Sequence, residues 1–530
     1  MKKEPSKPFL IILGASIFNI IFWQEKPGIN IIIFDAFICT SVCLLFPFAL
    51  RNRAALWLLA LHILCAILVV INNTFLSEIA FAVTLLLFIS FSQYIHRSVV
   101  YASGSAFLNY LFVVPNLFAE LGSIRRNTAQ NKRRSWVRML LIPLFLSVLF
   151  GIIYSFANGV FSIYINNMAT SVNSWFKNFF DWFSINRILF FIAGAMIVGG
   201  LLLRSKDYFS KKDLLQNNNL PRKKDRFIKW SASPFADVMH IIIGERAKGI
   251  LALKNEYFIG KASLVLLNLL LLFINGIDVK YVWLGYAFSN SASASEYVHE
   301  GTGMLIFSVV LAMCLLLFFF RGNINFYKKN KWLKYLAYLW ILQNLFLVLS
   351  VFNRDYYYIS HFALAYKRIG LLFFLAMVLS GLLTIFFKIR FQKTTYYLLR
   401  LNAWVALTLL VSASFVNWDV TIAKYNIARS TSIPLDMHFI LSLSDKTLPI
   451  IEQHPGIFNA DTSGNTFYWN NNYYDARQFF EFRKQHFINS QRNYTWLSWN
   501  VADANVKKEL AVGTRLFSRT TSSLSRTWSM

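Results

Sequence analysis

Long apolar runs, about eleven of them, recur along the chain up to residue 416. An α-helix of about 20 apolar residues crosses the roughly 30 Å hydrocarbon core of a bilayer. Only 15% of the 530 residues are charged, whereas soluble chains carry about 25%. We therefore expect an all-α, polytopic transmembrane helical bundle of about eleven spans with a small extracytoplasmic C-terminal tail domain. The expected spans are residues 9–23, 28–50, 54–71, 75–95, 137–158, 187–203, 258–275, 304–320, 335–352, 368–387 and 399–416.

Lysine and arginine gather in alternate loops between these runs, as they do in proteins whose orientation follows the positive-inside rule. With this set of spans, the loops on the cytoplasmic side hold 33 basic residues and the outer loops hold 7. The bias predicts a cytoplasmic N-terminus and an extracytoplasmic C-terminus, with the lipid bilayer as the main partner. Because the basic residues are distributed in this way, the net charge of +28 does not indicate a nucleic-acid partner.

Residues 1–254 are expected to form an N-terminal membrane region of about six spans. The weaker run 99–121 would place the basic stretch 125–138 outside if it crossed, so we interpret it as an interfacial or re-entrant helix. Residues 166–184 have the spacing of an amphipathic helix on the outer leaflet. Residues 204–254 form a basic cytoplasmic loop, which either binds anionic lipid headgroups or only enforces the topology.

Residues 255–416 are expected to hold about five further spans, and residues 417–530 a polar tail with about 12 disordered residues at its end. Residues 296–330 read EYVHEGTGMLIFSVVLAMCLLLFFFRGNINFYKKN, and NWDVTIAKYNIARS and YTWLSWNVADA follow in the tail. These strings resemble the bacterial membrane-protein family catalogued as domain of unknown function 4173, over about residues 255–505. The resemblance implies a multi-pass protein of the bacterial cytoplasmic (inner) membrane and implies no activity.

A polar cluster is expected at the outer ends of the later spans. Its members are Glu296, His299, Glu300, Arg354, Asp355, His361, Lys367, Arg368 and Asp419. Glu296, His299 and Glu300 share a helix face because they are three and four residues apart. We interpret the cluster first as the gathering of charged and aromatic residues that is common at interfacial helix ends. A solute or proton site is one alternative, and a divalent metal at His299, Glu300 and His361 is another. We otherwise expect no metal and no cofactor.

Asp35, His62 and Glu78 are ionisable residues within the apolar runs. A charge at the bilayer centre costs about 2.5–3.5 kcal/mol on insertion scales, so such residues usually face the bundle interior. Asp35 and His62 on neighbouring spans could pair as a proton-coupling site, or could only join two helices; Glu78 can reach the interface by snorkelling. Cys39 and Cys43 are one turn apart, and we interpret them as small residues at helix contacts.

Catalytic motifs are missing: there is no GxGxxG after a strand, no Walker lysine loop and no GxSxG. The leading hypothesis is a transporter or permease-like protein for a small or lipid-linked solute. A non-catalytic envelope or signalling protein that binds a partner through its outer tail is a second hypothesis. A third is a membrane-embedded transferase with a lipid-phosphate donor held by Arg354, Lys367 and Arg368. The missing motifs favour a protein that is not an enzyme.

Overall fold

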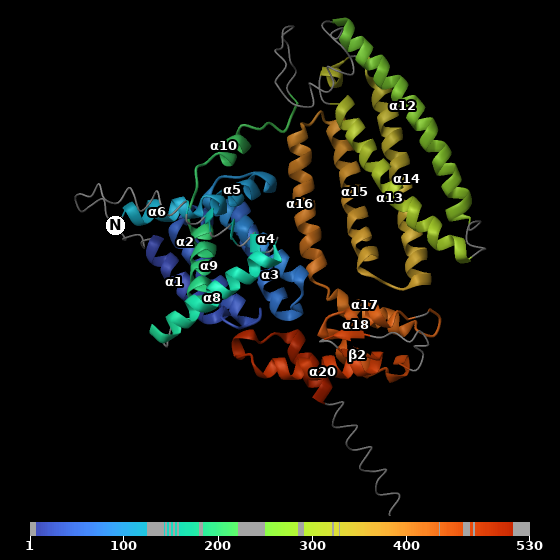
Figure 1. Cartoon of the computed structure of the whole chain (residues 1–530). Helices are drawn as coiled ribbons and strands as arrows, with labels where there is room; N and C mark the ends of the chain where they lie inside the picture. Colours follow the sequence, from blue (N-terminus) through green and yellow to red (C-terminus); the bar gives the residue numbers. More distant parts are fainter. Residues whose placement is uncertain are drawn as a thin grey trace, which may run out of the picture. The chain divides into compact units, whose positions relative to one another are not determined.

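A computed structural model shows two compact units built almost entirely from helices (Figure 1). The first unit contains residues 1–214 and 485–508, and the second contains residues 215–484 and 509–530. The described residues are 7–123, 143, 146–147, 150–151, 154–155, 158–179, 184–220, 250–284, 291–320, 323–327, 329–433, 435–458, 467–469 and 472–511.

The first unit is a group of apolar helices with short polar connections. Asn52 and Thr74 cap the starts of α3 and α4 with their side chains, and Asn73 ends α3 in the left-handed conformation. The bounds are α1 (Lys7–Phe22), α2 (Ile29–Leu45), η1 (Pro47–Arg51), α3 (Arg53–Asn72), α4 (Phe75–Gln93), α5 (Val99–Leu111), α6 (Val113–Ser123), α8 (Gly159–Phe179), α9 (Ile185–Leu202), α10 (Phe209–Leu214) and η7 (Trp496–Ser498).

The second unit packs long helices side by side, with short helices following α16 at one end (Figure 1). Its core is aliphatic and aromatic, and includes Leu264, Leu316, Trp340, Val348 and Leu382. The bounds are α12 (Ile250–Asp278), η3 (Val279–Trp283), α13 (Ser291–Phe319), η4 (Asn323–Phe326), α14 (Lys331–Phe362), α15 (Tyr366–Arg390), α16 (Thr395–Ser414), α17 (Trp418–Ala428), α18 (Met437–Ser442), η5 (Asp445–Thr447), α19 (Leu448–Glu452) and η6 (Pro455–Phe458). The strands β1 (Phe467–Trp469) and β2 (Asn472–Tyr474) form an antiparallel hairpin, and α20 (Ala476–Arg492) continues into the first unit.

The number of candidate spans is seven among the described residues, or eight if one bent pair is counted, so the prediction of about eleven is wrong. The runs 9–23 and 28–50 form helices of only 16 and 17 residues. α2 stops at Leu45 because the helical conformation is disfavoured before Pro47. In α13, the apolar described part is Gly303–Phe319, which is also short. Most of the expected span 137–158 lies outside the described residues.

The candidate spans carry apolar side chains that stay exposed on the described part of the chain. On α12 the exposed residues include Leu266, Leu269, Leu270 and Phe273. Such a surface is unfavourable in water and favourable in a hydrocarbon layer. The apolar helices therefore indicate a membrane location.

The run 99–121 forms α5 and α6, which are bent by 63° relative to one another. Close to the end of α6, Glu120 accepts a hydrogen bond from Lys7 at the start of α1 (3.1 Å). Helix α9 runs antiparallel to α1, so the end of α9 lies beside the start of α1. Gln93, the last residue of α4, donates to the last turn of α9. The end of α4 therefore lies at the same end of the unit. Both ends of the bent pair thus lie at one end of the unit, which favours an interfacial or re-entrant helix over a broken span.

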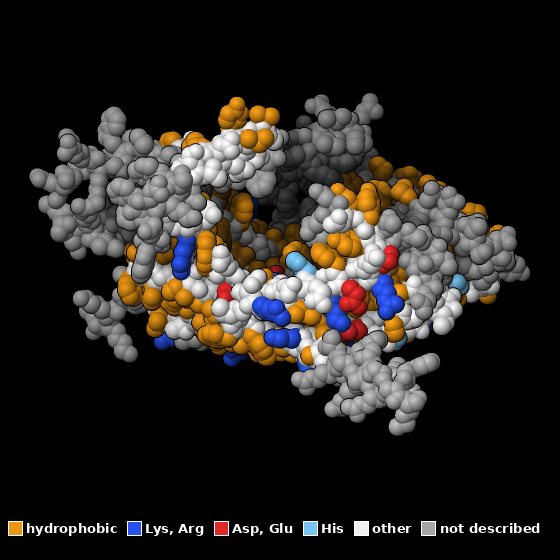
Figure 2. All heavy atoms as spheres, turned by 60° about the horizontal axis from the view of Figure 1, so that its bottom comes forward, with side chains coloured by type: hydrophobic (Ala, Val, Ile, Leu, Met, Phe, Trp, Pro, Cys, Tyr) orange, Lys and Arg blue, Asp and Glu red, His pale blue; other side chains and the backbone are white. Residues whose placement is uncertain are grey.

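The separate tail domain that the sequence predicted is not present. Residues 417–484 belong to the second unit, where Arg483 pairs with Asp445 and Lys484 with Glu452. Residues 485–508 belong to the first unit. Figure 2 brings forward the face that carries α17, α18 and α20, and there acidic and basic side chains lie close together among apolar ones.

The other two non-spanning segments are described only in part. α8 covers most of the stretch 166–184, and its side chains beyond residue 171 lie outside the description. The loop 204–254 includes α10, in which Asp213 is buried and accepts hydrogen bonds from the backbone amides of Arg97 and Ser98. The predicted lipid-headgroup contact falls mainly on residues 221–249, outside the described residues.

Candidate functional site: a buried carboxylate, imidazole and thiol

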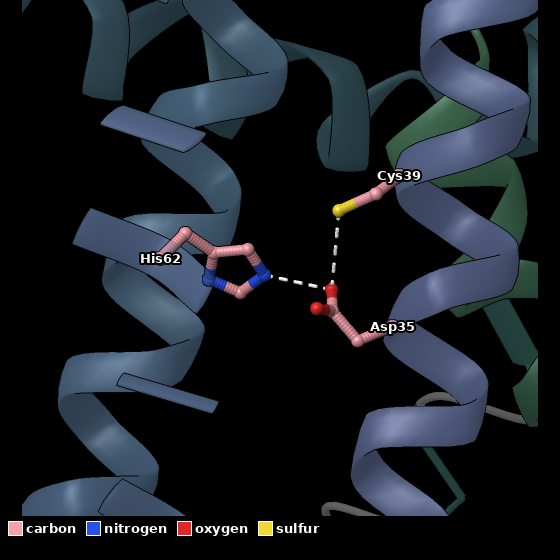
Figure 3. A group of neighbouring side chains, drawn as sticks. All are labelled: Asp35, Cys39 and His62. Carbon is pink, nitrogen blue, oxygen red and sulfur yellow. Dashed lines mark hydrogen bonds and ion pairs between the residues drawn. The ribbon is translucent and has the colours of Figure 1, made fainter. Parts of the chain in front are cut away.

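The most developed polar centre of the first unit lies between α2 and α3. Asp35 and Cys39 project from one helix toward His62 on the other (Figure 3). The Nε2 atom of His62 lies 2.7 Å from Oδ1 of Asp35, and both residues are buried, with 0% and 6% of their surface exposed. The structure thus brings together the two intramembrane residues that the sequence pairs.

A third helix orients the imidazole. Nδ1 of His62 lies 3.1 Å from Oγ1 of Thr84 on α4, and that hydroxyl donates to the carbonyl of Ala80 at 2.7 Å. A hydroxyl has one hydrogen to donate. Because the carbonyl can only accept, Thr84 is the acceptor toward His62, and the hydrogen-bond network assigns the hydrogen to Nδ1.

This assignment determines how many protons lie in the short contact between His62 and Asp35. With Nδ1 already protonated, one further proton is shared between Nε2 and the carboxyl group. The pair is electrically neutral whether that proton sits on the ring or on the carboxyl. Neutrality matters because an unpaired charge is costly among apolar helices.

Cys39 completes the centre from the next turn of α2. Its thiol donates to Oδ1 of Asp35 across 3.4 Å, and the residue is half-buried. The ligand atoms of Asp35, Cys39 and His62 all lie within 4.8 Å of one another. Behind the ring, Cys65 hydrogen-bonds Thr84, and the ring of Phe81 packs 4.9 Å from that of His62. Glu78, in the first turn of α4, is half-buried and is not part of this group.

The predicted outer cluster separates into smaller groups within the second unit. Arg354 on α14 pairs with Asp278 at the end of α12, and Ser350 donates to the same carboxylate at 2.6 Å. All three residues are buried. Arg354 thus bonds to Asp278, a residue that the sequence reading did not include.

Asp355 and Arg368 form a second group. Asp355 is buried, its Oδ2 has no hydrogen-bond partner among the described residues, and Arg368 acts on it electrostatically. Arg368 also donates to the carbonyl of Phe362 at 2.6 Å and lies over the ring of Tyr358.

The remaining members lie at the surface or outside the description. His361 is exposed and bonds the carbonyl of Tyr357, and Lys367 is exposed at the start of α15. Asp419 on α17 accepts from the hydroxyl of Tyr366 and from the backbone amide of Ser444. Glu296, His299 and Glu300 lie on α13, but their side chains are outside the described residues, so the metal alternative at His299, Glu300 and His361 stays a prediction.

Sequence reasoning missed three buried ionisable groups. Asp278 stands at the end of an apolar run, and Lys388 caps α13 by donating to the carbonyl of Phe320 at 3.0 Å. His96 lies 3.5 Å from Asp213 and 2.9 Å from the hydroxyl of Ser105. Each group lies near the end of an apolar run. Charged residues are common there, so their presence in the sequence does not indicate a buried contact.

The long apolar helices, with polar groups buried between them, define the class of the protein as all-α and membrane-type. The chain belongs to the family described as domain of unknown function 4153 (DUF4153), whose model matches residues 32–454. The resemblance to family 4173 is therefore wrong. Its strings are rich in apolar and aromatic residues, which lipid favours in unrelated membrane families, and YTWLSWNVADA lies beyond the matched range. No curated protein and no solved structure matches the chain.

Proposed function

We propose that the protein is a multi-pass, permease-like membrane protein in which the Asp35–Cys39–His62 centre binds the coupling cation. The observation that carries the proposal is the buried carboxylate–imidazole pair between two apolar helices. Intramembrane ionisable residues are rare because they are costly, and they commonly mark ion pathways. If the pair served only stability, apolar residues of similar volume could replace it without loss, because burying two polar groups costs free energy of desolvation.

The proposed orientation has the N-terminus in the cytoplasm and the C-terminus outside, in a bacterial cytoplasmic membrane. Contacts within the first unit support this alternation. Asn73, at the turn between α3 and α4, bonds the carbonyl of Pro27 between α1 and α2. At the opposite ends of α3 and α4, Asn52 bonds the carbonyl of Phe91. The turns assigned to one side of the membrane therefore meet one another.

The centre between α2 and α3 supports a solute permease better than the outer cluster does. Asp278 holds Arg354, and Phe362, Tyr358 and Asp355 engage Arg368. Two of the three cations that a phosphate donor would need are thus already bound within the chain. For this reason the transferase hypothesis receives no support from the geometry.

The test uses the full-length protein in liposomes loaded with a fluorescent pH indicator. Inward gradients of Na⁺, K⁺, Mn²⁺ or Zn²⁺ are imposed one at a time. At least one cation should change the lumenal pH in a way that protein-free liposomes do not show. Asp35→Asn and His62→Gln should abolish that response, because each removes a ligand from the centre.

The matched control is Glu78→Gln, which neutralises an ionisable residue on the adjacent helix outside the centre. This variant should respond like the wild type. Asp35→Glu keeps a carboxylate and should retain part of the response, which separates loss of function from loss of folding. A wild-type protein silent toward all four cations, or an undiminished response in Asp35→Asn, would overturn the proposal.

A second candidate, partner binding through the outer part of the chain, is favoured by one surface feature. Tyr468 and Tyr473 of the β1–β2 hairpin are 61% and 73% exposed, and their ring centroids lie 5.1 Å apart. Tyrosines of this kind are common at protein interfaces. If the hairpin binds an envelope partner, Tyr468→Ala with Tyr473→Ala should remove a specific cross-link in intact membranes without lowering protein abundance, and a persisting cross-link would argue against it.

A further inference from the structure

We propose that Asp35, Cys39 and His62 bind a divalent transition-metal ion of the zinc type. This inference rests on the proposed function and specifies its cation. Asp35 and Cys39 are four residues apart on α2, so they share one helix face, and His62 meets them from α3 (Figure 3).

The donor set selects the class of ion. An imidazole nitrogen, a thiolate and a carboxylate are the three ligand types that zinc takes in proteins. A thiolate is a soft ligand that Mg²⁺ and Ca²⁺ do not favour, whereas zinc and its neighbours in the transition series do. Three protein ligands leave a fourth position for water or a transported ligand.

The distances are close to those that such an ion needs. With metal–ligand bonds of about 2.0–2.3 Å, neighbouring donors of a tetrahedral site lie about 3.4–3.6 Å apart. Sγ of Cys39 is already 3.4 Å from Oδ1 of Asp35. The 2.7 Å contact between Oδ1 and Nε2 of His62 must open by about 0.7 Å. All the donor atoms lie within 4.8 Å of one another, so side-chain rotation can form the site.

Thr84 prepares the imidazole for this role. Because Thr84 accepts the hydrogen of Nδ1, the other nitrogen, Nε2, is the one directed at Asp35 and Cys39. Metal-binding histidines usually have their second nitrogen held by such a hydrogen bond, and its loss costs about 10–100-fold in affinity. Thr84 is therefore a positioning residue for the ligand His62.

The charge balance suits a site among apolar helices. The metal-free centre holds one proton shared by Asp35 and His62 and one on the thiol of Cys39. Binding a divalent ion to neutral imidazole, carboxylate and thiolate releases both protons to solvent. The centre is then neutral with or without the metal, and one divalent ion exchanges for two protons.

The test is a zinc titration of the purified full-length protein in detergent, after treatment with a chelator. The wild type should bind one zinc ion per chain and release about two protons. Asp35→Asn and His62→Gln should lose at least about a hundredfold in affinity, and Thr84→Val should lose about 10–100-fold. Bound Co²⁺ should show a thiolate-to-metal charge-transfer band in the wild type and none in Cys39→Ser.

Cys43→Ser is the matched control, since Cys43 lies one turn further along the same helix. It should bind zinc as the wild type does and keep the cobalt band. Absence of saturable zinc binding, or equal affinities of Cys39→Ser, Cys43→Ser and the wild type, would overturn the inference. If liposomes respond to another cation through Asp35 while zinc does not bind, the permease stands and the metal site falls. If zinc binds but no cation changes the lumenal pH, the metal site is supported and the permease function is refuted.

Discussion

At the scale of single residues, Gly28 shows how one missing side chain permits a long-range contact. The backbone φ of Gly28 is −170°, an extended value that any residue can adopt. The reason for glycine is space, because an added Cβ would lie 2.5 Å from the carbonyl carbon of Ser498. Around it, the amide of Ile29 donates to the carbonyl of Trp499 at 3.0 Å, and Glu25 accepts from the hydroxyl of Ser498.

Gly28→Ala should therefore destabilise the first unit by about 1–3 kcal/mol, the usual range for an overpacked site. The opposing atoms belong to backbone, which cannot rotate away. The thermal unfolding midpoint of the purified protein measures the effect. Gly276→Ala is the control, because nothing lies within 4 Å of a Cβ at that position. Equal unfolding midpoints for the two variants would show that Ser498 does not pack on Gly28.

At the scale of elements, polar side chains fix the register of neighbouring apolar helices. Gln343 of α14 donates to Asn268 of α12 at 2.9 Å, and Asn402 of α16 donates to Thr384 of α15 at 2.9 Å. These amides thus join neighbouring apolar helices. The ion pair of Asp278 and Arg354 adds a stronger constraint, because apolar surfaces alone let helices slide.

Breaking that ion pair from one side should be expensive. Asp278→Asn or Arg354→Gln alone should lower the free energy of unfolding by about 3–5 kcal/mol, since a buried charge loses its partner. The double variant should cost less than the sum of the two single variants. Unfolding in mixed micelles measures all three. The control is Ser380→Ala, which removes a hydroxyl that donates to Met377 within the same helix. Additive losses would contradict a direct pair.

At the scale of the whole molecule, the chain returns to its beginning. Residues 494–500 lie against the connection between α1 and α2, where Lys26 lies over the ring of Tyr494 and its amide donates to Ser498. The positive-inside reading predicts that both segments lie outside. The contact requires only that they share one side, whichever side that is.

Cysteine labelling tests this orientation. In a variant without the four native cysteines, Lys367→Cys should react with a membrane-impermeant maleimide added to intact cells. Lys211→Cys should react only after permeabilisation, because it lies on the side proposed to be cytoplasmic. Both lysines are exposed, so access depends on the membrane alone. The opposite pattern would invert the topology.

The sequence by itself determined that long apolar helices suited to a membrane form, and that Asp35 and His62 lie on neighbouring helices. These predictions depend on local composition. They also depend on the cost of exposing backbone polar groups to hydrocarbon, and each helix avoids that cost with its own hydrogen bonds. The expected span 28–50 was too long because apolar composition continues past Pro47, whereas the α-helix ends before it.

Only the tertiary structure decided which polar groups meet. Cys39 bonds Asp35, Thr84 bonds His62, and Asp278 pairs with Arg354. Residues 494–500 lie against the connection between α1 and α2. Such contacts depend on helix rotation and on chain segments hundreds of residues apart. The hydropathy pattern is the same for every rotation that keeps apolar faces toward lipid, so it cannot select among them.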